Sequence, residues 1–284
     1  MLLEQTLEQL TKMRLLGMAN ALRQWCNSPR DTQLTPEDLI GLLADAEWIW
    51  RENNKLSSRL RRASFKEKAC IEEIDYSFHS GLSKAMITEL SSSRWVMSHR
   101  NIILSGPTGA GKTFLACALG NKACRDGYSV AYRRTTRLFD ELAQARADGT
   151  ARLLMKRLAK THVLILDDFA GQPLTATERR DLLEVLDDRY GSSSTVLASQ
   201  LESDDWHVVI GEETLADSIC DRIVHNAHRI RLHGESVRKL KEERDRAELN
   251  KSTVQDPEPK APKAKRKPPS RKSTKPSTKP KRRR

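Results

Sequence analysis

A glycine-rich segment near the middle of the chain carries the residues best suited to phosphate chemistry. Residues 106–113 read Gly-Pro-Thr-Gly-Ala-Gly-Lys-Thr and match the pattern GxxxxGK[ST], between a strand-like run at 102–105 and a helical segment at 114–125. Glycines let the backbone curl so that its N–H groups face a phosphate, and the N-terminus of the following helix adds partial positive charge. Lys112 can reach the β- and γ-phosphates of a nucleotide, and the Thr113 hydroxyl can ligate Mg²⁺. The predicted nucleotide contacts are Gly106, Pro107, Thr108, Gly109, Ala110, Gly111, Lys112, Thr113 and Phe114.

Two adjacent carboxylates follow a second apolar run. The residues Val-Leu-Ile-Leu at 163–166 read as a buried central strand, and Asp167 and Asp168 come directly after it. In a doubly wound sheet this end of the strand lies beside the phosphate loop, where Asp167 can hold Mg²⁺ through water. Asp168 can orient or deprotonate the attacking water. Alternatively, the pair only opens a turn or caps a helix.

Polar residues at the end of another apolar run are candidates for sensing the γ-phosphate. The run at 195–198 reads as a strand, and Ser199 and Gln200 follow it. Gln200 has the longer reach, but both residues can also simply end the strand.

One arginine in a helical segment can act on a neighbouring copy of the chain. Arg222 lies outside the phosphate loop and can complete a second subunit's active site as an arginine finger. On the residues alone, an intramolecular salt bridge with Asp217 or Asp221 is the simpler interpretation.

The elements that must position these residues are short apolar runs alternating with amphipathic segments. The strand-like runs are 101–105, 129–132, 162–166 and 195–198. Such alternation is typical of an α/β fold with a mostly parallel sheet covered by helices on both faces. The first 68 residues read as helical, with a helix start at Thr35-Pro36-Glu37. We predict a small all-helical domain at 1–68, a phosphate-binding α/β domain at 69–242 and a disordered basic tail at 243–284.

Positive charge is distributed unevenly along the 284 residues. The formal net charge is +12, and the fourteen Lys and Arg residues against two acidic residues after Asn250 account for all of it. Such a tail can hold nucleic acid without reading its sequence, or it can serve only to solubilise the chain. A second basic stretch in the helical region can contact phosphates of DNA, although a solvated helix face is the alternative. Its candidate DNA contacts are Arg51, Lys55, Arg59, Arg61, Arg62 and Lys66.

Composition favours a protein that works in the cytoplasm. No apolar run approaches the ~20 residues that a membrane-spanning helix needs. The first residues lack the basic and apolar pattern of a secretory signal. The five cysteines form no CxxC pair, so we expect reduced thiols and no zinc site.

Taken in order, these residues resemble the IstB-like ATPases, a branch of the AAA+ superfamily related to DnaC-type helicase loaders. The likeness includes the segments 7–19, 47–53, 74–76, 179–190 and 221–226 together with the phosphate loop, and it ends near 234–239. The resemblance implies a small helical domain followed by an AAA+ module, with ATP bound between the subunits of a homo-oligomer. It also implies that Arg222 acts in trans and that Ser199 or Gln200 occupies the sensor position. Members of this family assemble on duplex DNA and help the transposase of an insertion element to engage its target.

The sequence departs from the wider AAA+ pattern at one acidic position. Many AAA+ ATPases have Asp-Glu at this strand end, whereas Asp168 is one methylene shorter. The IstB-like branch resembles this chain in having Asp in place of Glu, so ATPase activity is still expected. The role of Asp168 in activating water stays open.

We therefore predict an ATPase that uses ATP and Mg²⁺, assembles on duplex DNA in the ATP state and helps a transposase, with hydrolysis as the release step. A helicase loader of the DnaC type is the alternative. A small-molecule kinase and a DNA-binding protein that holds ATP without hydrolysing it are two further possibilities, and the basic helical region gives the kinase no support.

Overall fold

The computed structural model describes residues 2–27, 34–77 and 82–233. The predicted basic tail at 243–284 and the segment 234–239 lie outside these residues. In the described part of the chain, no helix is long and apolar enough to cross a lipid bilayer.

Three helices form the N-terminal region: α1 (Leu2–Lys12), α2 (Leu16–Asn27) and α3 (Pro36–Ala63). As the sequence predicts, α3 begins directly after Thr35. The Thr35 hydroxyl accepts a hydrogen bond from the Asp38 amide at 3.2 Å, and the Asp38 carboxylate accepts one from the Thr35 amide at 3.3 Å. This reciprocal capping box fixes the start of the helix. The helix ends where Ser64 adopts a left-handed conformation with φ of 55°.

A buried carboxylate joins α2 to α3. Glu47 on α3 is 5% exposed and accepts hydrogen bonds from the amides of Gly17 at 2.7 Å and Met18 at 3.2 Å. These amides lie in the first turn of α2, where they have no partner within their own helix, so Glu47 caps α2 from outside. Gly17 is required at this contact because an added Cβ would lie 2.6 Å from the Ala46 carbonyl oxygen. Arg51 completes the arrangement by donating from Nε to Glu47 at 2.7 Å.

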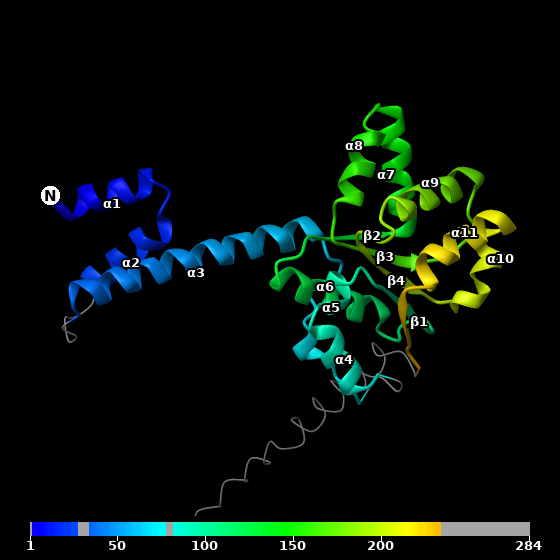
Figure 1. Ribbon diagram of the computed structural model, residues 1–284, viewed down its shortest axis with the longest axis horizontal. Helices are drawn as coiled ribbons and strands as arrows, with labels where there is room; N and C mark the ends of the chain where they lie inside the picture. Colours follow the sequence, from blue (N-terminus) through cyan, green and yellow to red (C-terminus); the bar gives the residue numbers. More distant parts are fainter. Residues whose placement is uncertain (1, 28–33, 78–81, 234–284) are drawn as a thin grey trace, which may run out of the picture. The chain divides into compact units, whose positions relative to one another are not determined.

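A five-stranded parallel sheet follows (Figure 1). The strand order is β2-β3-β4-β1-β5. The strands are β1 (Asn101–Ser105), β2 (Val130–Arg134), β3 (Val163–Phe169), β4 (Ser194–Ser199) and β5 (Ala227–Arg231). The three central strands are buried on both faces almost throughout, which is why they read as continuous apolar runs. The predicted α/β fold is confirmed.

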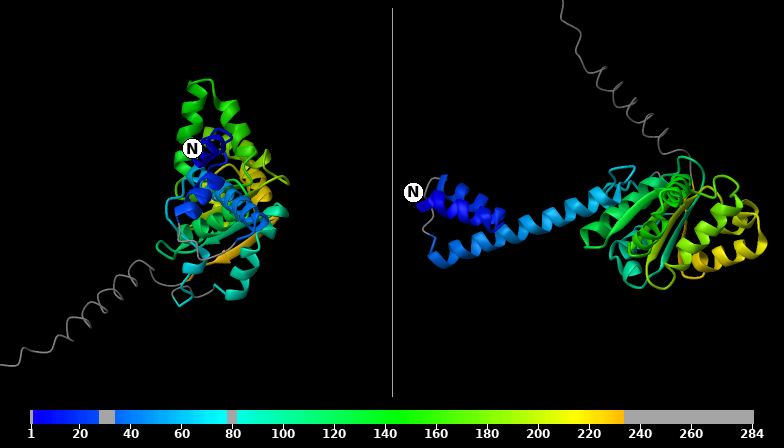
Figure 2. Two further views of the ribbon diagram at one scale, coloured as in Figure 1. Left: turned by 90° about the vertical axis from the view of Figure 1, so that its left-hand side faces the viewer. Right: turned by 90° about the horizontal axis from the view of Figure 1, so that it is seen from above.

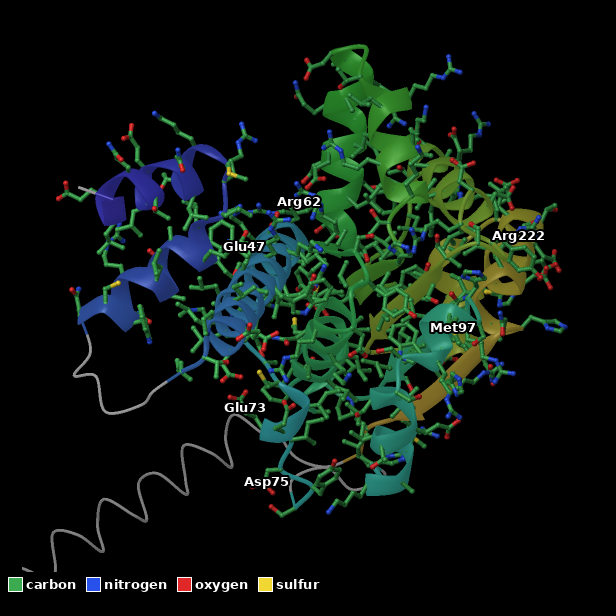
Figure 3. All side chains as sticks on the ribbon, turned by 60° about the vertical axis from the view of Figure 1, so that its left-hand side comes forward. Glu47, Arg62, Glu73, Asp75, Met97 and Arg222 are labelled. Carbon is green, nitrogen blue, oxygen red and sulfur yellow. The ribbon has the colours of Figure 1, made fainter. Side chains whose placement is uncertain are left out.

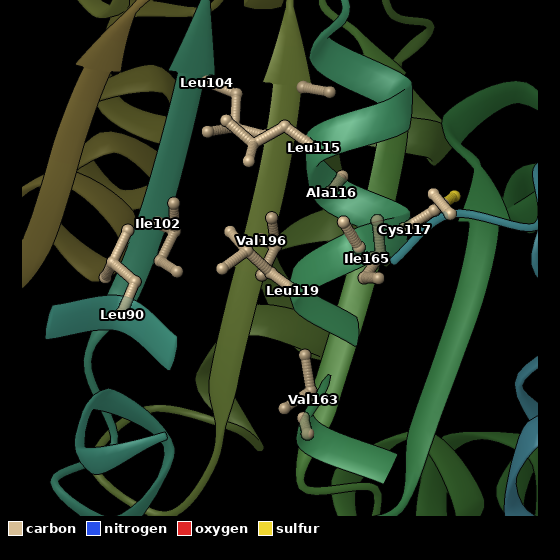
Figure 4. Close-up of a cluster of buried hydrophobic side chains, with 14 of the residues drawn as sticks. Leu90, Ile102, Leu104, Leu115, Ala116, Cys117, Leu119, Val163, Ile165 and Val196 are labelled. Carbon is tan, nitrogen blue, oxygen red and sulfur yellow. The ribbon is translucent and has the colours of Figure 1, made fainter. Parts of the chain in front are cut away.

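Helices cover both faces of the sheet (Figure 2). Alternate residues of each central strand divide between two hydrophobic clusters, so Ile102 and Leu104 pack on one side and Ile103 on the other. Figure 4 shows the first cluster, in which Leu115 and Leu119 of α6 lie against the sheet. The remaining helices are α4 (Lys84–Ser91), α5 (Arg94–Met97), α6 (Lys112–Arg125), α7 (Thr135–Ala147), α8 (Ala151–Ala159), α9 (Ala176–Asp187), α10 (Trp206–Ile210) and α11 (Glu213–Val224), with short 3₁₀ turns η1 (Ile71–Glu73) and η2 (Ser203–Asp205).

The fifth strand was missed by the sequence prediction. The residues of β5 read Ala-His-Arg-Ile-Arg, and only Ile230 among them is buried. An edge strand exposes most of its side chains, so it lacks the apolar run that marks the central strands. Its pairing with β1 depends on backbone hydrogen bonds that the sequence pattern does not reveal.

Candidate nucleotide site

The phosphate loop joins the C-terminal end of β1 to the N-terminus of α6. Gly106, Gly109 and Gly111 all have positive φ angles, of 143°, 87° and 88°. Side chains other than glycine rarely adopt this conformation, so the motif supplies glycine where the backbone turns. At Gly106 an added Cβ would also clash with the Leu232 carbonyl oxygen. The resulting loop ends at the first turn of α6, whose free amides and dipole favour an anion.

The lysine of the motif folds back over the loop. Lys112 donates from Nζ to the carbonyl oxygens of Gly106 at 2.7 Å and Pro107 at 2.8 Å. Burial lowers the pKa of Lys112, and the nearby carboxylates of Asp167 and Asp168 oppose that shift. The ammonium group is thus positioned at the mouth of the loop, where phosphate oxygens can replace the two carbonyl acceptors.

Asp167 lies at the centre of the site and is 1% exposed. The Thr113 hydroxyl lies 3.0 Å from both of its carboxylate oxygens, and the Tyr132 hydroxyl donates to Oδ2 at 2.5 Å. Burial raises the pKa of Tyr132, and its hydrogen bond to the Asp167 carboxylate raises it further. The Lys66 ammonium group lies 3.7 Å from Oδ2. A hydroxyl and a carboxylate held together at the phosphate loop are the oxygen donors that Mg²⁺ prefers, so these residues fit the ion.

Asp168 has a different setting from its neighbour. It has a positive φ of 55° and its side chain is exposed. Arg134 at the end of β2 lies 3.1 Å from its Oδ2 atom. The strand is irregular here, because the pairing of β3 with β4 shifts register between Leu166 and Phe169. The two carboxylates therefore point in different directions and have different partners, Asp167 inward and Asp168 outward.

The two candidate sensor residues are separated by their surroundings. The Ser199 hydroxyl is fully buried and accepts hydrogen bonds from the Leu201 amide at 3.1 Å and the Trp206 indole at 3.3 Å. Gln200 is exposed, and its Oε1 accepts a hydrogen bond from the Thr108 hydroxyl in the phosphate loop at 2.9 Å. The geometry favours Gln200 as the residue that contacts the nucleotide, and it gives Ser199 a structural role.

Arg222 lies near the N-terminal ends of the strands, whereas the phosphate loop follows the C-terminal end of β1. The Asn101 side chain, at the start of β1, donates to the carbonyl oxygens of Arg222 and Ile223, each at 3.1 Å. The loop begins at Gly106, five residues farther along the chain, which at ~3.3 Å each is about 16 Å away. The Arg222 guanidinium pairs with Asp187 at 2.6 Å and more loosely with Asp221 at 3.5 Å. Arg222 therefore does not belong to the nucleotide site of its own chain.

The candidate DNA contacts do not form one surface with a common role. Lys66 faces Asp167, and Arg59 donates from Nε to the Cys124 carbonyl oxygen at 2.8 Å. Arg51 pairs with Glu47, and Lys55 pairs with Glu52 at 2.8 Å. Arg61 and Arg62 are exposed, and neither forms an ion pair with the residues that the structure describes. Figure 3 labels Arg62, which lies near the C-terminal end of α3. These two arginines remain the best placed of the six for a phosphate backbone.

The sequence analysis did not include Tyr132 or Arg134 in the site, gave Lys66 to DNA instead, and did not note a second basic surface. Tyr132, Lys66 and Arg134 reach the carboxylates from elements that carry no recognisable motif, so their role depends on the fold. The second basic surface is α8, which contains three basic residues and no acidic ones. A helix with this composition could have been noted from the sequence as a phosphate-binding candidate. Its basic residues are Arg152, Lys156 and Arg157.

Solved structures share the fold of the described core. AMPPCP-bound DnaA from Aquifex aeolicus aligns with a TM-score of 0.51 at 18% identity, over 66% of this chain and 57% of that chain. DnaI aligns with a TM-score of 0.50 at 20% identity, over 60% of this chain and 90% of that chain. At this level of identity the likeness shows a common AAA+ fold alone.

Sequence relatives are much closer. The chain is 47% identical over 239 residues to the insertion sequence ATP-binding protein y4pL of Sinorhizobium fredii (strain NBRC 101917 / NGR234), covering 84% of this chain and 98% of that protein. It is 30% identical over 245 residues to the insertion sequence IS21 ATP-binding protein of Pseudomonas aeruginosa, covering 86% of this chain and 92% of that protein. The family profile described as IstB-like ATP binding protein matches residues 8–245. With a phosphate loop, a buried Asp167 and a parallel AAA+ sheet in place, the chain belongs to the IstB-like ATP binding protein family.

Proposed function

We propose that this protein is an ATPase that assembles on duplex DNA in the ATP-bound state and helps a transposase to engage its target. The observation that carries the proposal is the contact of Thr113 with the buried Asp167, 3.0 Å to each carboxylate oxygen, at the base of a glycine-rich loop. This pair joins two segments 54 residues apart at the place where a triphosphate and its metal ion would be bound. The function of the curated relatives as insertion sequence ATP-binding proteins agrees with it.

Each residue of the site has a separate task in the proposed hydrolysis. Lys112 and the loop amides hold the phosphates, and Gln200, directly after β4, contacts the γ-phosphate. Thr113 and Asp167 would hold Mg²⁺, which would supply positive charge to stabilise the charge developing on the phosphates. Asp168 positions the attacking water once its carboxylate is released from Arg134.

Arg222 provides the reason to expect an oligomer. It lies too far from its own phosphate loop to stabilise charge there, yet its side chain is one-third exposed and its guanidinium pairs with two surface carboxylates, Asp187 and Asp221. A neighbouring copy whose nucleotide faces this edge would receive Arg222 as a finger in trans. ATP then favours assembly to the extent that the assembled state binds it better than the free chain does.

Two basic surfaces can hold the DNA backbone. Arg61 and Arg62 at the end of α3 are exposed, and so are the three basic residues of α8. Contacts of this kind are electrostatic and largely independent of base sequence, so we expect weak sequence preference and strong dependence on salt. Because the proposed activity needs ATP and duplex DNA in one compartment, it places the protein in the cytoplasm.

The central experiment measures phosphate release with and without duplex DNA. We expect ATP hydrolysis that rises on DNA addition, and a Lys112→Ala variant that neither binds ATP nor hydrolyses it. Electron microscopy of the protein with DNA should show assemblies with ATP and none with ADP or without nucleotide. Lys122→Ala, which removes a partly exposed ion pair with Asp126 at the far end of α6, is the matched control and should behave as the wild type.

The client protein is tested by co-purification. Recovery with a transposase supports the proposal, whereas recovery with a replicative helicase supports the helicase-loader alternative. A Lys112→Ala variant that assembles on DNA as the wild type does would refute the nucleotide-dependent switch. ATP turnover that is unchanged by DNA in a monomeric protein would refute the role of assembly.

A further inference from the structure

The end of α3 is attached to the helix that begins at the phosphate loop. Arg59 in the last turns of α3 donates from Nε to the Cys124 carbonyl oxygen near the C-terminus of α6. Immediately after α3, the ring of Phe65 packs against Gly120 of α6 so closely that an added Cβ there would lie 2.7 Å from ring atom Cε1. These two contacts fix the path of the chain as it leaves α3.

The next residues, Lys66 and Glu67, lie beside Cys117 of α6. The amides of Glu67 and Lys66 face the thiol of Cys117 in the middle of α6; burial raises the pKa of that thiol to about 11, and the two amides oppose the rise. From this position Lys66 extends its side chain to Asp167, with 3.7 Å between Nζ and Oδ2. The side chain of Lys66 remains 32% exposed, whereas that of Asp167 is 2% exposed.

Asp167 needs a counter-charge while the site holds no metal ion. A buried carboxylate is costly unless a charged partner compensates it. The hydroxyls of Thr113 and Tyr132 donate hydrogen bonds but carry no charge. Lys112 directs its ammonium group to the loop carbonyls. Within the described residues, Lys66 is the cation that forms an ion pair with Asp167.

We propose that Lys66 is a positioning residue of the nucleotide site, whose ammonium group neutralises Asp167 in the metal-free state and yields this role to Mg²⁺. The inference rests on the proposed function, since it assumes that Mg²⁺ and a nucleotide bind at Thr113 and Asp167. It also explains why Lys66 does not lie with the exposed arginines of α3.

The effect of Lys66 on the affinity for the nucleotide must then depend on whether the metal ion is bound. Without Mg²⁺, loss of the ammonium group leaves a bare carboxylate beside the phosphates of the nucleotide, and like charges repel. With Mg²⁺ bound, the carboxylate is already compensated, so the same loss matters little. A residue that only supports the fold, or one that only contacts the nucleotide, would act equally in both conditions.

The experiment measures the dissociation constant of the hydrolysis-resistant ATP analogue AMPPCP by calorimetry, in EDTA and in Mg²⁺. For Lys66→Gln we expect about tenfold weaker binding in EDTA and a change of no more than about twofold in Mg²⁺. Lys66→Arg keeps the charge and should bind as the wild type in both buffers. Lys68→Gln makes the same charge change at an exposed position two residues away and should also leave both constants unchanged.

A double-mutant cycle with Asp167→Asn separates this role from a general effect on the fold. In that background the carboxylate is absent, so Lys66→Gln should no longer change the affinity in EDTA. The same cycle, read as melting temperature in EDTA without nucleotide, should show Lys66→Gln lowering the temperature by about 3 °C in the wild type and leaving it unchanged in Asp167→Asn.

Three outcomes would overturn the role of Lys66. They are equal losses of affinity in EDTA and Mg²⁺, a loss that persists in Asp167→Asn, and a melting temperature that Lys66→Gln does not alter in EDTA. A wild-type protein that binds AMPPCP in neither buffer would instead refute the proposed function. The melting cycle would then still decide whether Lys66 compensates Asp167.

Discussion

Replacement of Arg222 by alanine tests the proposal that each nucleotide site is completed by a neighbouring subunit. The fold should survive, because the ion pair with Asp187 is between side chains that are 32% and 51% exposed, and such surface pairs contribute little to stability. The Arg222→Ala variant should bind ATP as the wild type does, since Arg222 is separated from its own loop by the length of β1. Hydrolysis should fall by about 10³-fold or more, the usual effect of losing an arginine finger.

Mixing of two inactive variants shows whether the finger acts in trans. Arg222→Ala has an intact phosphate loop but no finger, whereas Asp167→Asn has a finger but no metal ligand. In an equal mixture that assembles at random, about one quarter of the contacts between subunits pair an intact site with an intact finger. Phosphate release per protomer should therefore return to about one quarter of the wild-type rate, although each variant alone is nearly inactive.

The controls isolate the contact between subunits. Mixing Arg222→Ala with a chain that carries both substitutions should restore no activity, because that chain offers neither a finger nor a competent site. Arg180→Ala removes an exposed arginine of α9 and should leave hydrolysis unchanged. Absence of recovery in the complementing mixture, or an Arg222→Ala rate within threefold of wild type, would refute the reasoning.

Further substitutions test the division of roles around the loop. Gln200→Ala, which removes the acceptor for Thr108, should slow hydrolysis by about tenfold or more with an unchanged melting temperature; an unaltered rate would contradict its role as sensor. Ser199→Ala should do the reverse and lower the free energy of unfolding by about 1–3 kcal/mol, measured by urea denaturation, because two buried donors lose their acceptor. Gly120→Ala should cost about 1–3 kcal/mol in the same assay, since the added Cβ meets an aromatic ring at 2.7 Å. Gly41→Ala is its matched control in α3, where an added Cβ meets no described atom within 4 Å, and it should stabilise the helix by up to about 1 kcal/mol. An equal change in stability for the two glycine variants would contradict the close packing of Phe65 against Gly120.

Local patterns were sufficient to predict the central part of the fold and site. The phosphate loop requires glycines at fixed spacing and a helix directly after them, and both requirements are visible within one continuous segment. The three central strands read as apolar runs because both of their faces are buried. Thr35, Pro36 and Glu37 likewise predicted the start of α3 from three neighbouring residues.

The tertiary structure decided how distant residues combine. It brought Tyr132 and Lys66 to Asp167, separated Gln200 from the buried Ser199, and placed Arg222 at the edge of the sheet away from the loop. No sequence pattern could supply these facts, because each depends on which strand lies beside which and on which end of the sheet a residue occupies. Short-range motifs fix the backbone of the loop through local conformation, whereas the charges around it are arranged by packing across the whole α/β core.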